Sequence, residues 1–301
     1  MDDIRIYAFA DEAGAALDAQ IAAMKRNGLS GLEIRNVDGT NVSDITIEKA
    51  KEVKEKLDAN GLITWSVGSP IGKISINDDF PAHLDKLKHT LDIADILKAK
   101  NIRIFSFYIP EGTAHKDCKE EVIDRMGAML DVAHGTGIEL CHENEKGIYG
   151  DTAERLLDLH KSFPALKGIF DCANFVQCGV DTLDAWEKLK SYIHYLHIKD
   201  SLYDGTVVPA GMGAGNVEKI LRMYIEQGGR CVTMEPHLAV FEGLSELERK
   251  GEESNIGKYS YESNDAAFDA ACEAFKNIRS KIYEYHRLPH HKRYKPQRSE
   301  M

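Results

Sequence analysis

Residues 138–151 read IELCHENEKGIYGD, and this stretch carries the features that decide the fold. It opens with a short apolar run of the kind that forms a buried strand. The run ends in the polar pair Glu143-Asn144. Asp151 then precedes a stretch of helical periodicity, where its carboxylate can accept the unpaired N–H groups of a first helical turn. The stretch therefore predicts a buried strand with a polar carboxyl end, followed by a helix.

Runs of the same kind recur along the whole chain. They begin near Ile4, Leu32, Leu62, Ile102, Ile138, Leu166, Ile193 and Arg230, and their spacings of 27 to 40 residues leave room for one crossover helix each time. Helices are predicted between and after them at residues 17–27, 47–60, 81–98, 119–134, 152–162, 182–192, 217–227 and 264–285. This alternation predicts eight βα units and a parallel sheet.

Eight βα units can close as a barrel or lie open as a doubly wound sheet, and periodicity does not distinguish the two. No G-x-G-x-x-G motif follows the first strand, so the dinucleotide crevice of many open sheets has no signature here. Acidic and imidazole side chains instead end four late strands, where barrel enzymes assemble their active sites. We therefore predict an α/β protein with a single-domain (β/α)8 TIM-barrel fold over residues 1–301.

Two segments stand outside this pattern. Residues 239–262 form a long insertion before the last helix, which suits a lid, an oligomer contact or a plain surface loop. Residues 286–301 form a polar tail that contains the only dense basic cluster of the chain. Such a tail is typical of a solvated terminus.

Composition and charge exclude several kinds of partner. The net charge of −11 disfavours binding to nucleic acid or to anionic lipid, because both repel an acidic protein. The six cysteines contain no C-x-x-C pair, as expected in a reducing compartment. The amino terminus MDDIRIYAFADEAG lacks the basic and apolar regions of a signal peptide. We expect a cytoplasmic protein that acts on a small molecule.

Four neighbouring strands end in groups that can hold a metal ion: Glu143, Asp171, His197 and Glu235. Any one of them alone would be explained by a helix cap or an ion pair with a lysine. Charged groups gathered in a barrel mouth, however, must be paired or bound to a cation to offset their desolvation. Three carboxylates and one imidazole suit Mn²⁺ first, with Mg²⁺, Co²⁺ or Zn²⁺ as alternatives.

Nearly the whole chain resembles the xylose-isomerase-like TIM barrels of the sugar phosphate isomerase/epimerase family. The matching segments occur in the family's order and read HENEKGIYGD (142–151), FDCAN (170–174), YLHIKD (195–200), VPAGMGAGN (208–216) and MEPHL (234–238). The resemblance implies that the metal ligands are Glu143, Asp171, His197 and Glu235. It also implies a homo-oligomer, either a dimer or a tetramer.

The resemblance implies proton abstraction next to a carbonyl of a sugar or sugar phosphate, because a metal that chelates two substrate oxygens stabilises an enediolate. Glu143 and Glu235 would then be the catalytic base and acid on opposite sides of the sugar. Two departures from the ketose epimerases of the family limit how far this mechanism can be carried over to the chain. Asn174 stands where they have a His, and Lys199-Asp200 stands where they have an Arg.

The His-x-Lys-Asp sequence at residues 197–200 also resembles metal-dependent dehydratases of keto-inositols. A lyase acting on a keto-inositol or a 3-keto-glycoside is therefore the alternative. Lys199 can serve as a base or hold a substrate hydroxyl; equally, it can pair with Glu143 or Glu145. A DNA-repair nuclease of the same superfamily disagrees with the acidic net charge. A scaffold protein would not need four intact ligand positions.

Other residues are candidates for substrate binding. His237 is in phase with Glu235 and can contact substrate or orient a ligand, and Asn174 follows the metal-binding aspartate. Glu33 and Arg35 share one strand face, where they can contact a distal hydroxyl or pair with each other. Trp65 can stack on a sugar ring, although a core position is the better interpretation.

A glycine-rich loop at residues 211–215 precedes the helix predicted from residue 217. Backbone N–H groups of such a loop can bind phosphate with help from the helix dipole. No Lys-Ser/Thr pair follows the loop, so a nucleotide is not expected.

Overall fold

Across the described residues, 4–247 and 255–287, the computed structural model of the chain closes eight parallel strands into a barrel. Around the ring their order is β1, β2, β5, β6, β7, β8, β9 and β12, and β12 pairs with β1. Their bounds are Arg5–Ala8 (β1), Gly31–Ile34 (β2), Ile63–Val67 (β5), Asn101–Ile104 (β6), Glu139–Glu143 (β7), Lys167–Asp171 (β8), Ile193–Ile198 (β9) and Cys231–Met234 (β12). The predicted (β/α)8 TIM barrel is confirmed.

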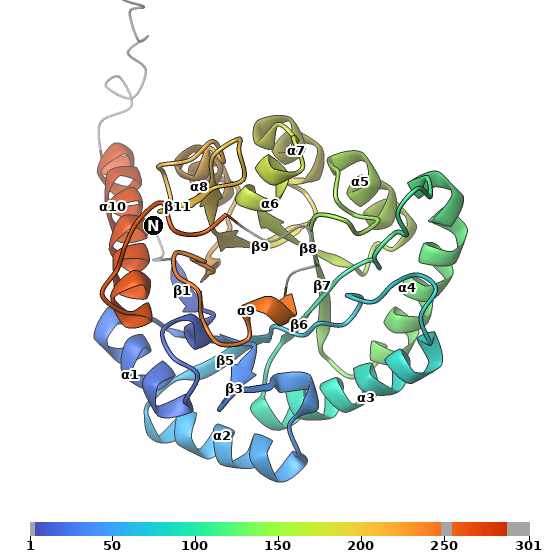
Figure 1. Ribbon diagram of the computed structural model, residues 1–301, viewed down its shortest axis with the longest axis horizontal. Helices are drawn as coiled ribbons and strands as arrows, with labels where there is room; N and C mark the ends of the chain where they lie inside the picture. Colours follow the sequence, from blue (N-terminus) through green and yellow to red (C-terminus); the bar gives the residue numbers. More distant parts are fainter. Residues whose placement is uncertain (1–3, 248–254, 288–301) are drawn as a thin grey trace, which may run out of the picture.

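Helices surround the ring on its outside, as Figure 1 shows. The longer ones are Leu17–Asn27 (α1), Ile47–Ala59 (α2), Phe80–Leu97 (α3), Lys119–Ala133 (α4), Ala153–Ser162 (α5), Thr182–Leu189 (α7), Val217–Glu226 (α8) and Asn264–Arg287 (α10). Each lies within three residues of its predicted bounds. None of the helices in the described ranges is both long enough and apolar enough to cross a membrane.

Short elements decorate this frame. They are the helices Cys172–Gln177 (α6) and Leu244–Leu247 (α9), the strands Asn36–Val37 (β3), Thr40–Asn41 (β4), Asp200–Ser201 (β10) and Val207–Val208 (β11), and the three-ten helices Ala10–Glu12, Val42–Asp44 and His115–Cys118. Residues 248–254 of the expected insertion lie outside the described residues, as does the expected tail from residue 288 onward.

The predicted capping of α5 by Asp151 is wrong. The residue that caps α5 is Thr152, whose side chain accepts the Arg155 N–H, whereas Asp151 forms an ion pair with the Arg155 guanidinium. Asp171 caps the unpredicted α6 by accepting the Asn174 N–H at 2.8 Å.

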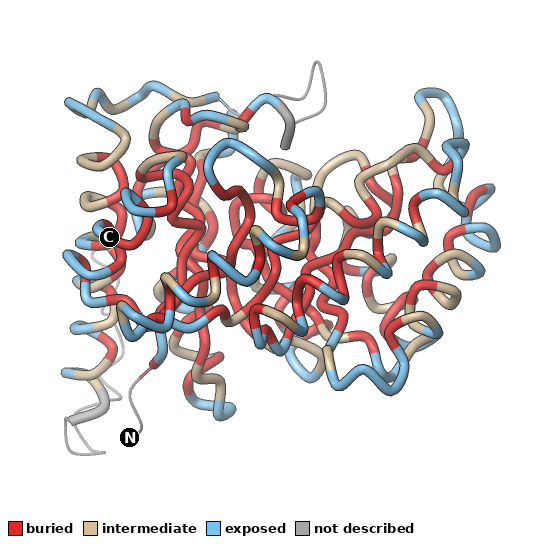
Figure 2. The backbone as a smooth tube through the Cα atoms, turned by 90° about the horizontal axis from the view of Figure 1, so that it is seen from below, coloured by how far each residue is buried: buried red, intermediate tan, exposed pale blue. Residues whose placement is uncertain are grey.

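The alternation of side chains along each strand separates two apolar regions. On β1, Ile6 and Ala8 belong to the large core between the barrel and its helices, while Tyr7 points into the barrel. Inside, Tyr7 packs with Tyr195 and with Trp65, whose ring lies 4.9 Å from that of Tyr7. Trp65 is therefore partly buried and packs against this inner cluster. Figure 2 shows buried chain through the middle of the molecule and exposed chain mainly at its rim.

A buried histidine supports the loop that follows β5. His83 of α3 accepts the Gly72 N–H through Nε2 at 2.7 Å. Gly72 has φ +87°, and a Cβ there would collide with the Phe105 carbonyl oxygen, so only glycine fits. Burial, together with the nearby positive charges of Lys86 and Arg125, lowers the pKa of His83 to about 4.

This histidine makes stability depend on pH. Its folded pKa lies below the ordinary 6.5, so its stabilising contribution is complete above pH 6.5 and is lost as the pH falls toward 4. The pKa difference corresponds to about 3 kcal/mol. We expect His83→Gln to lose less stability than the wild type between pH 7 and pH 4.5, measured by urea unfolding at both values. An identical loss in both proteins would contradict this assignment.

Candidate metal centre

The four strand-end groups converge in the structure. Glu143 and Asp171 end β7 and β8, His197 lies near the end of β9, and Glu235 directly follows β12. One ligand atom from each lies within 4.8 Å of the others, and all four side chains are buried. These strands are consecutive in the ring, so the barrel itself brings the four groups together.

His197 lies at the middle of this cluster. Its Nδ1 is 2.9 Å from Glu143 Oε1 and 3.1 Å from Glu235 Oε2. Burial alone would lower the pKa of His197, but the surrounding carboxylates, with Glu143 contributing most, raise it well above its ordinary value. The carboxylates around Nδ1 therefore favour positive charge at that position. A divalent ion bound to the same carboxylate oxygens would supply it.

Glu33 holds the other nitrogen of this imidazole. His197 Nε2 lies 3.1 Å from Glu33 Oε2, while Glu33 Oε1 accepts hydrogen bonds from Tyr195 Oη at 2.9 Å and Ser66 Oγ at 3.2 Å. Both carboxylate oxygens are thus engaged beneath the cluster. Of the two alternatives for Glu33 and Arg35, pairing with each other is wrong.

The contact between Glu33 and His197 gives a testable prediction. A carboxylate that orients a metal-binding imidazole typically improves metal affinity 10- to 100-fold. We expect Glu33→Gln to bind Mn²⁺ or Zn²⁺ more weakly by about that factor, as measured by competition with a chelating dye. Ser66→Ala is the matched control, because it removes one partner of Glu33 and leaves the bond to His197. Unchanged affinity in Glu33→Gln would exclude this role.

Arg103 was not identified from the sequence. This β6 side chain donates from Nη1 to Glu143 Oε2 at 3.1 Å, and the same atom lies 3.5 Å from Glu235 Oε1. Its guanidinium lies over the rings of Phe9 and Phe105, at 4.8 and 5.0 Å from their centroids. Each glutamate therefore directs one oxygen toward His197 and the other toward Arg103. The only sequence signal is an arginine inside the apolar run IRIF.

Lys199 pairs with two of the cluster's carboxylates. Its Nζ lies 3.2 Å from Asp171 Oδ2 and 3.5 Å from Glu235 Oε2. Burial by itself would lower the pKa of Lys199, but these carboxylates raise it above its ordinary value, so the side chain is an ammonium ion. Of the two alternatives for Lys199, the pairing with Glu143 or Glu145 is wrong, because its ion pairs are with Asp171 and Glu235. Glu145 pairs with Lys73 at 3.0 Å.

Arg35 belongs to a second buried charge cluster beside the first. It donates to both oxygens of Asp11, at 2.9 and 3.1 Å, and to Glu12 and Glu235, both at 3.3 Å. Its guanidinium also lies 4.4 Å from the centroid of the Phe9 ring. Asp11 and Glu12 were missed, although FADEAG follows the first strand and the strand-end rule would have found them. Burial raises the pKa of Glu12 to about 8.

His237 and Asn174 border the cluster. His237 has φ +47°, a strained value for a residue with a side chain, and its N–H donates to Glu12 Oε2 at 2.7 Å. Its Nε2 lies 3.7 Å from Glu235 Oε1, and burial lowers the pKa of the ring well below its ordinary value. Asn174 Nδ2 lies 3.4 Å from Glu143 Oε1. Both side chains therefore touch a candidate ligand.

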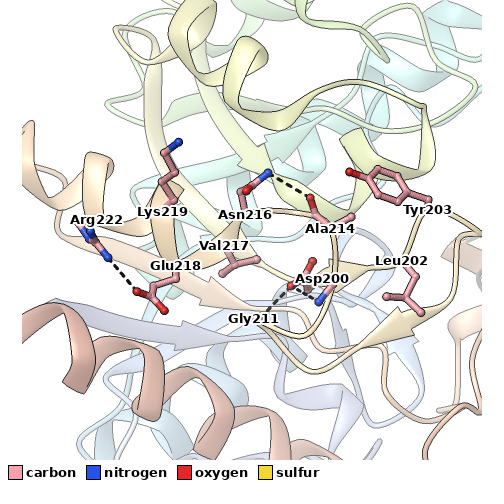
Figure 3. A pocket seen from close by; sticks show the side chains of 11 residues that line it. Asp200, Leu202, Tyr203, Gly211, Ala214, Asn216, Val217, Glu218, Lys219 and Arg222 are labelled. Atoms are coloured by element: carbon pink, nitrogen blue, oxygen red, sulfur yellow. Dashed lines mark hydrogen bonds and ion pairs between the residues drawn. The ribbon is translucent and has the colours of Figure 1, made fainter. Parts of the chain in front are cut away.

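The glycine loop binds a carboxylate of the chain itself. Asp200 Oδ2 accepts the N–H groups of Gly211 and Gly213 at 2.9 and 3.0 Å, and Oδ1 accepts those of Gly215 and Ser201 at 2.9 and 3.0 Å. A pocket of about 690 Å³ lies along this loop and α8. Asp200 is one of the residues that line it (Figure 3). The phosphate hypothesis for this loop is wrong, because Asp200 already occupies the three glycine N–H groups.

The chain is similar in sequence or in structure to several known proteins. A 3-dehydroshikimate dehydratase from Bacillus anthracis is 20% identical over 178 residues, which cover 58% of this chain and 62% of that protein. This chain thus spans about three-fifths of that relative's length. A crystal structure of the IOLI protein with a binding zinc atom has a TM-score of 0.70 and 14% identity, covering 93% of this chain and 99% of that one.

The 3-keto-D-glucoside 4-epimerase from E. coli is also similar, with a TM-score of 0.66 and 14% identity over 92% of this chain and 100% of that one. At such identities the structural likeness shows the fold alone. The sequence match to a family is more extensive, since residues 21–245 match the family described as xylose isomerase-like TIM barrel. That match covers most of the chain, which therefore belongs to the xylose isomerase-like TIM barrel family.

Proposed function

We propose that this protein is a divalent-metal-dependent isomerase or epimerase that moves a proton next to a carbonyl of a sugar or sugar phosphate. One observation carries the proposal, the buried convergence within 4.8 Å of Glu143, Asp171, His197 and Glu235. Their oxygen-rich donor set suits Mn²⁺ first, with Mg²⁺, Co²⁺ or Zn²⁺ as alternatives.

The proposed chemistry divides between the ion and the chain. A bound ion would chelate two substrate oxygens and stabilise the negative charge that develops on them. Glu143 takes the proton from the carbon and Glu235 returns one from the opposite side, or the reverse. Arg103 fixes both carboxylates by contacting the oxygen of each that faces away from His197.

The neighbouring side chains bind the substrate in this proposal. Lys199 is charged, which favours holding a substrate hydroxyl or carbonyl oxygen over acting as a base. His237 and Asn174 border the same cluster and supply further polar contacts. Glu33 and Arg35 have their polar groups engaged by the protein, so we assign them to positioning the ligands.

A lyase is the second candidate, and two observations favour it. The ammonium group of Lys199 lies 3.2 Å from Asp171 Oδ2, where it can assist the departure of a hydroxyl group from the carbon next to the one that loses its proton. The Bacillus anthracis relative is named as a dehydratase. Both reactions begin with the same loss of a proton, so they differ only in the second step.

We also propose that the protein acts in the cytoplasm on a small polyhydroxylated molecule as a homodimer or homotetramer. Among the described residues, Tyr203 and Val240 are large apolar side chains that are 86% and 72% exposed, which fits a contact between subunits. Light scattering coupled to size exclusion would give the number of subunits.

The reaction is tested by incubating the Mn²⁺-loaded enzyme with ketoses, ketose phosphates, keto-inositols and 3-keto-glycosides in D₂O. Deuterium in a recovered epimer or isomer supports the first candidate. An unsaturated product supports the lyase. If no compound exchanges a proton or is converted, both candidates fail.

A further inference from the structure

A second cavity lies at the opposite end of the barrel from the metal centre. It has a volume of about 240 Å³ and is bordered by the first residues of two strands, Arg5 of β1 and Ile63 of β5, and by Lys100 immediately before β6. The metal-binding groups lie at the carboxyl ends of their strands, whereas this cavity lies at the amino ends. It is therefore separate from the proposed active site.

The walls of this cavity are apolar and aromatic. Trp65 and Tyr7, whose rings stack 6° from parallel, line it together with the side chains of Leu57, Leu62 and Leu97. Such a surface favours the flat, apolar face of a ring. The volume admits a single six-membered ring with one or two substituents.

Positive charge predominates around the cavity. The cationic side chains Arg5, Lys54, Lys98 and Lys100 line it, against the single carboxylate of Asp58. Lys54 pairs with Asp58, and Lys98 pairs with Asp95. Within residues 4–247 and 255–287, neither Arg5 nor Lys100 forms an ion pair, although Arg5 hydrogen-bonds to Tyr7 and Cys231. Both side chains are exposed at the edge of the cavity and lack an acidic partner, so their charge can attract an anion that enters it.

Trp65 and Thr64, which line the cavity, also carry polar atoms without a partner. The indole Nε1 of Trp65 and the hydroxyl of Thr64 are buried, and neither has a hydrogen-bond partner within the part of the chain that the structure describes. A buried donor without an acceptor is costly, and an acceptor on a bound molecule would remove that cost.

We propose that this cavity binds a small monocyclic carboxylate, with the ring on the Trp65–Tyr7 pair and the carboxylate near Arg5 and Lys100. The ring accounts for the apolar and aromatic lining, and the carboxylate accounts for the unpaired cations and the donors without acceptors. The site is independent of the proposed reaction, because none of its lining residues belongs to the metal centre.

Titration with benzoate tests the proposal. Trp65 is one of only two tryptophans, so binding is expected to change the tryptophan fluorescence of the wild type and to leave that of Trp65→Phe unchanged. For a molecule of this size we expect a Kd of about 1 mM. Arg5→Met and Lys100→Met should each weaken binding about 5- to 10-fold. Lys116→Met is the matched control, because Lys116 is exposed and does not line the cavity.

A comparison of small molecules that lack either the ring or the charge tests which of these features the cavity recognises. Calorimetry should find that cyclohexanecarboxylate binds like benzoate, that benzyl alcohol binds at least about tenfold more weakly for lack of charge, and that inorganic phosphate binds weakly for lack of a ring. The proposal is overturned if benzoate does not saturate a site, or if Arg5→Met and Lys100→Met bind it as tightly as Lys116→Met does. Equal binding of benzyl alcohol would also overturn it.

Discussion

Glu143→Gln and Glu235→Gln are each expected to lower the rate of proton exchange at the substrate carbon by about 10³- to 10⁴-fold. Glutamine keeps the size of the side chain but can neither accept the proton nor provide a negative ligand. Each substitution would also leave Arg103 facing an amide in place of a carboxylate. The measurement is the rate of deuterium uptake into the substrate in D₂O, followed by NMR.

The control and the metal content make this result interpretable. Glu120→Gln changes an exposed glutamate at the start of α4 and should retain full activity. Metal bound per chain should be measured for every variant. Loss of a metal ligand lowers the metal content, whereas loss of a catalytic base lowers activity without lowering the metal content. A glutamine variant that keeps its metal and more than a tenth of its activity would remove that glutamate from the mechanism.

Arg35→Met is expected to cost about 3–5 kcal/mol of unfolding free energy, because breaking a buried ion pair leaves uncompensated charge in the interior. Asp11, Glu12 and Glu235 would all lose a donor within 3.3 Å, and the Arg35 side chain is fully buried. Urea unfolding at pH 7 measures the loss. Methionine conserves much of the volume and the contact with the Phe9 ring, so the lost charge dominates the effect.

Arg26 offers a matched comparison within the same chain. It also binds two aspartates, Asp265 and Asp269, both at 2.8 Å, but its side chain is 40% exposed. Exposed pairs contribute about 0–1 kcal/mol, so Arg26→Met should change stability little. Equal losses of unfolding free energy in Arg26→Met and Arg35→Met would show that burial does not determine how much these ion pairs contribute to stability.

The sequence predicted the frame of the barrel well, because that frame depends on local patterns. The bounds of α1 agree with the prediction at both ends, since Gly28, in the left-handed conformation, ends that helix. Glu143, Asp171 and His197 were likewise found from their place at strand ends. Parallel strands in a barrel direct those ends to one mouth, and this follows from topology alone.

The contacts around the ligands could not be predicted in this way. Arg103 was missed because the sequence does not show which inward-facing side chains of different strands lie at the same level in the barrel. That level depends on the tilt of the strands and on the stagger between them. Glu33 and Arg35 were expected to share a face. Because β2 ends at Ile34, Arg35 lies beyond the strand, where it contacts Asp11 and Glu235, whereas Glu33 contacts His197.

The charges around His197 bear on how the proposed metal site would be filled. The surrounding carboxylates raise the pKa of the imidazole, so a proton there and the guanidinium of Arg103 offset part of the carboxylate charge. A divalent ion bound to the same carboxylates would take the place of that proton, so a higher pH would favour its binding.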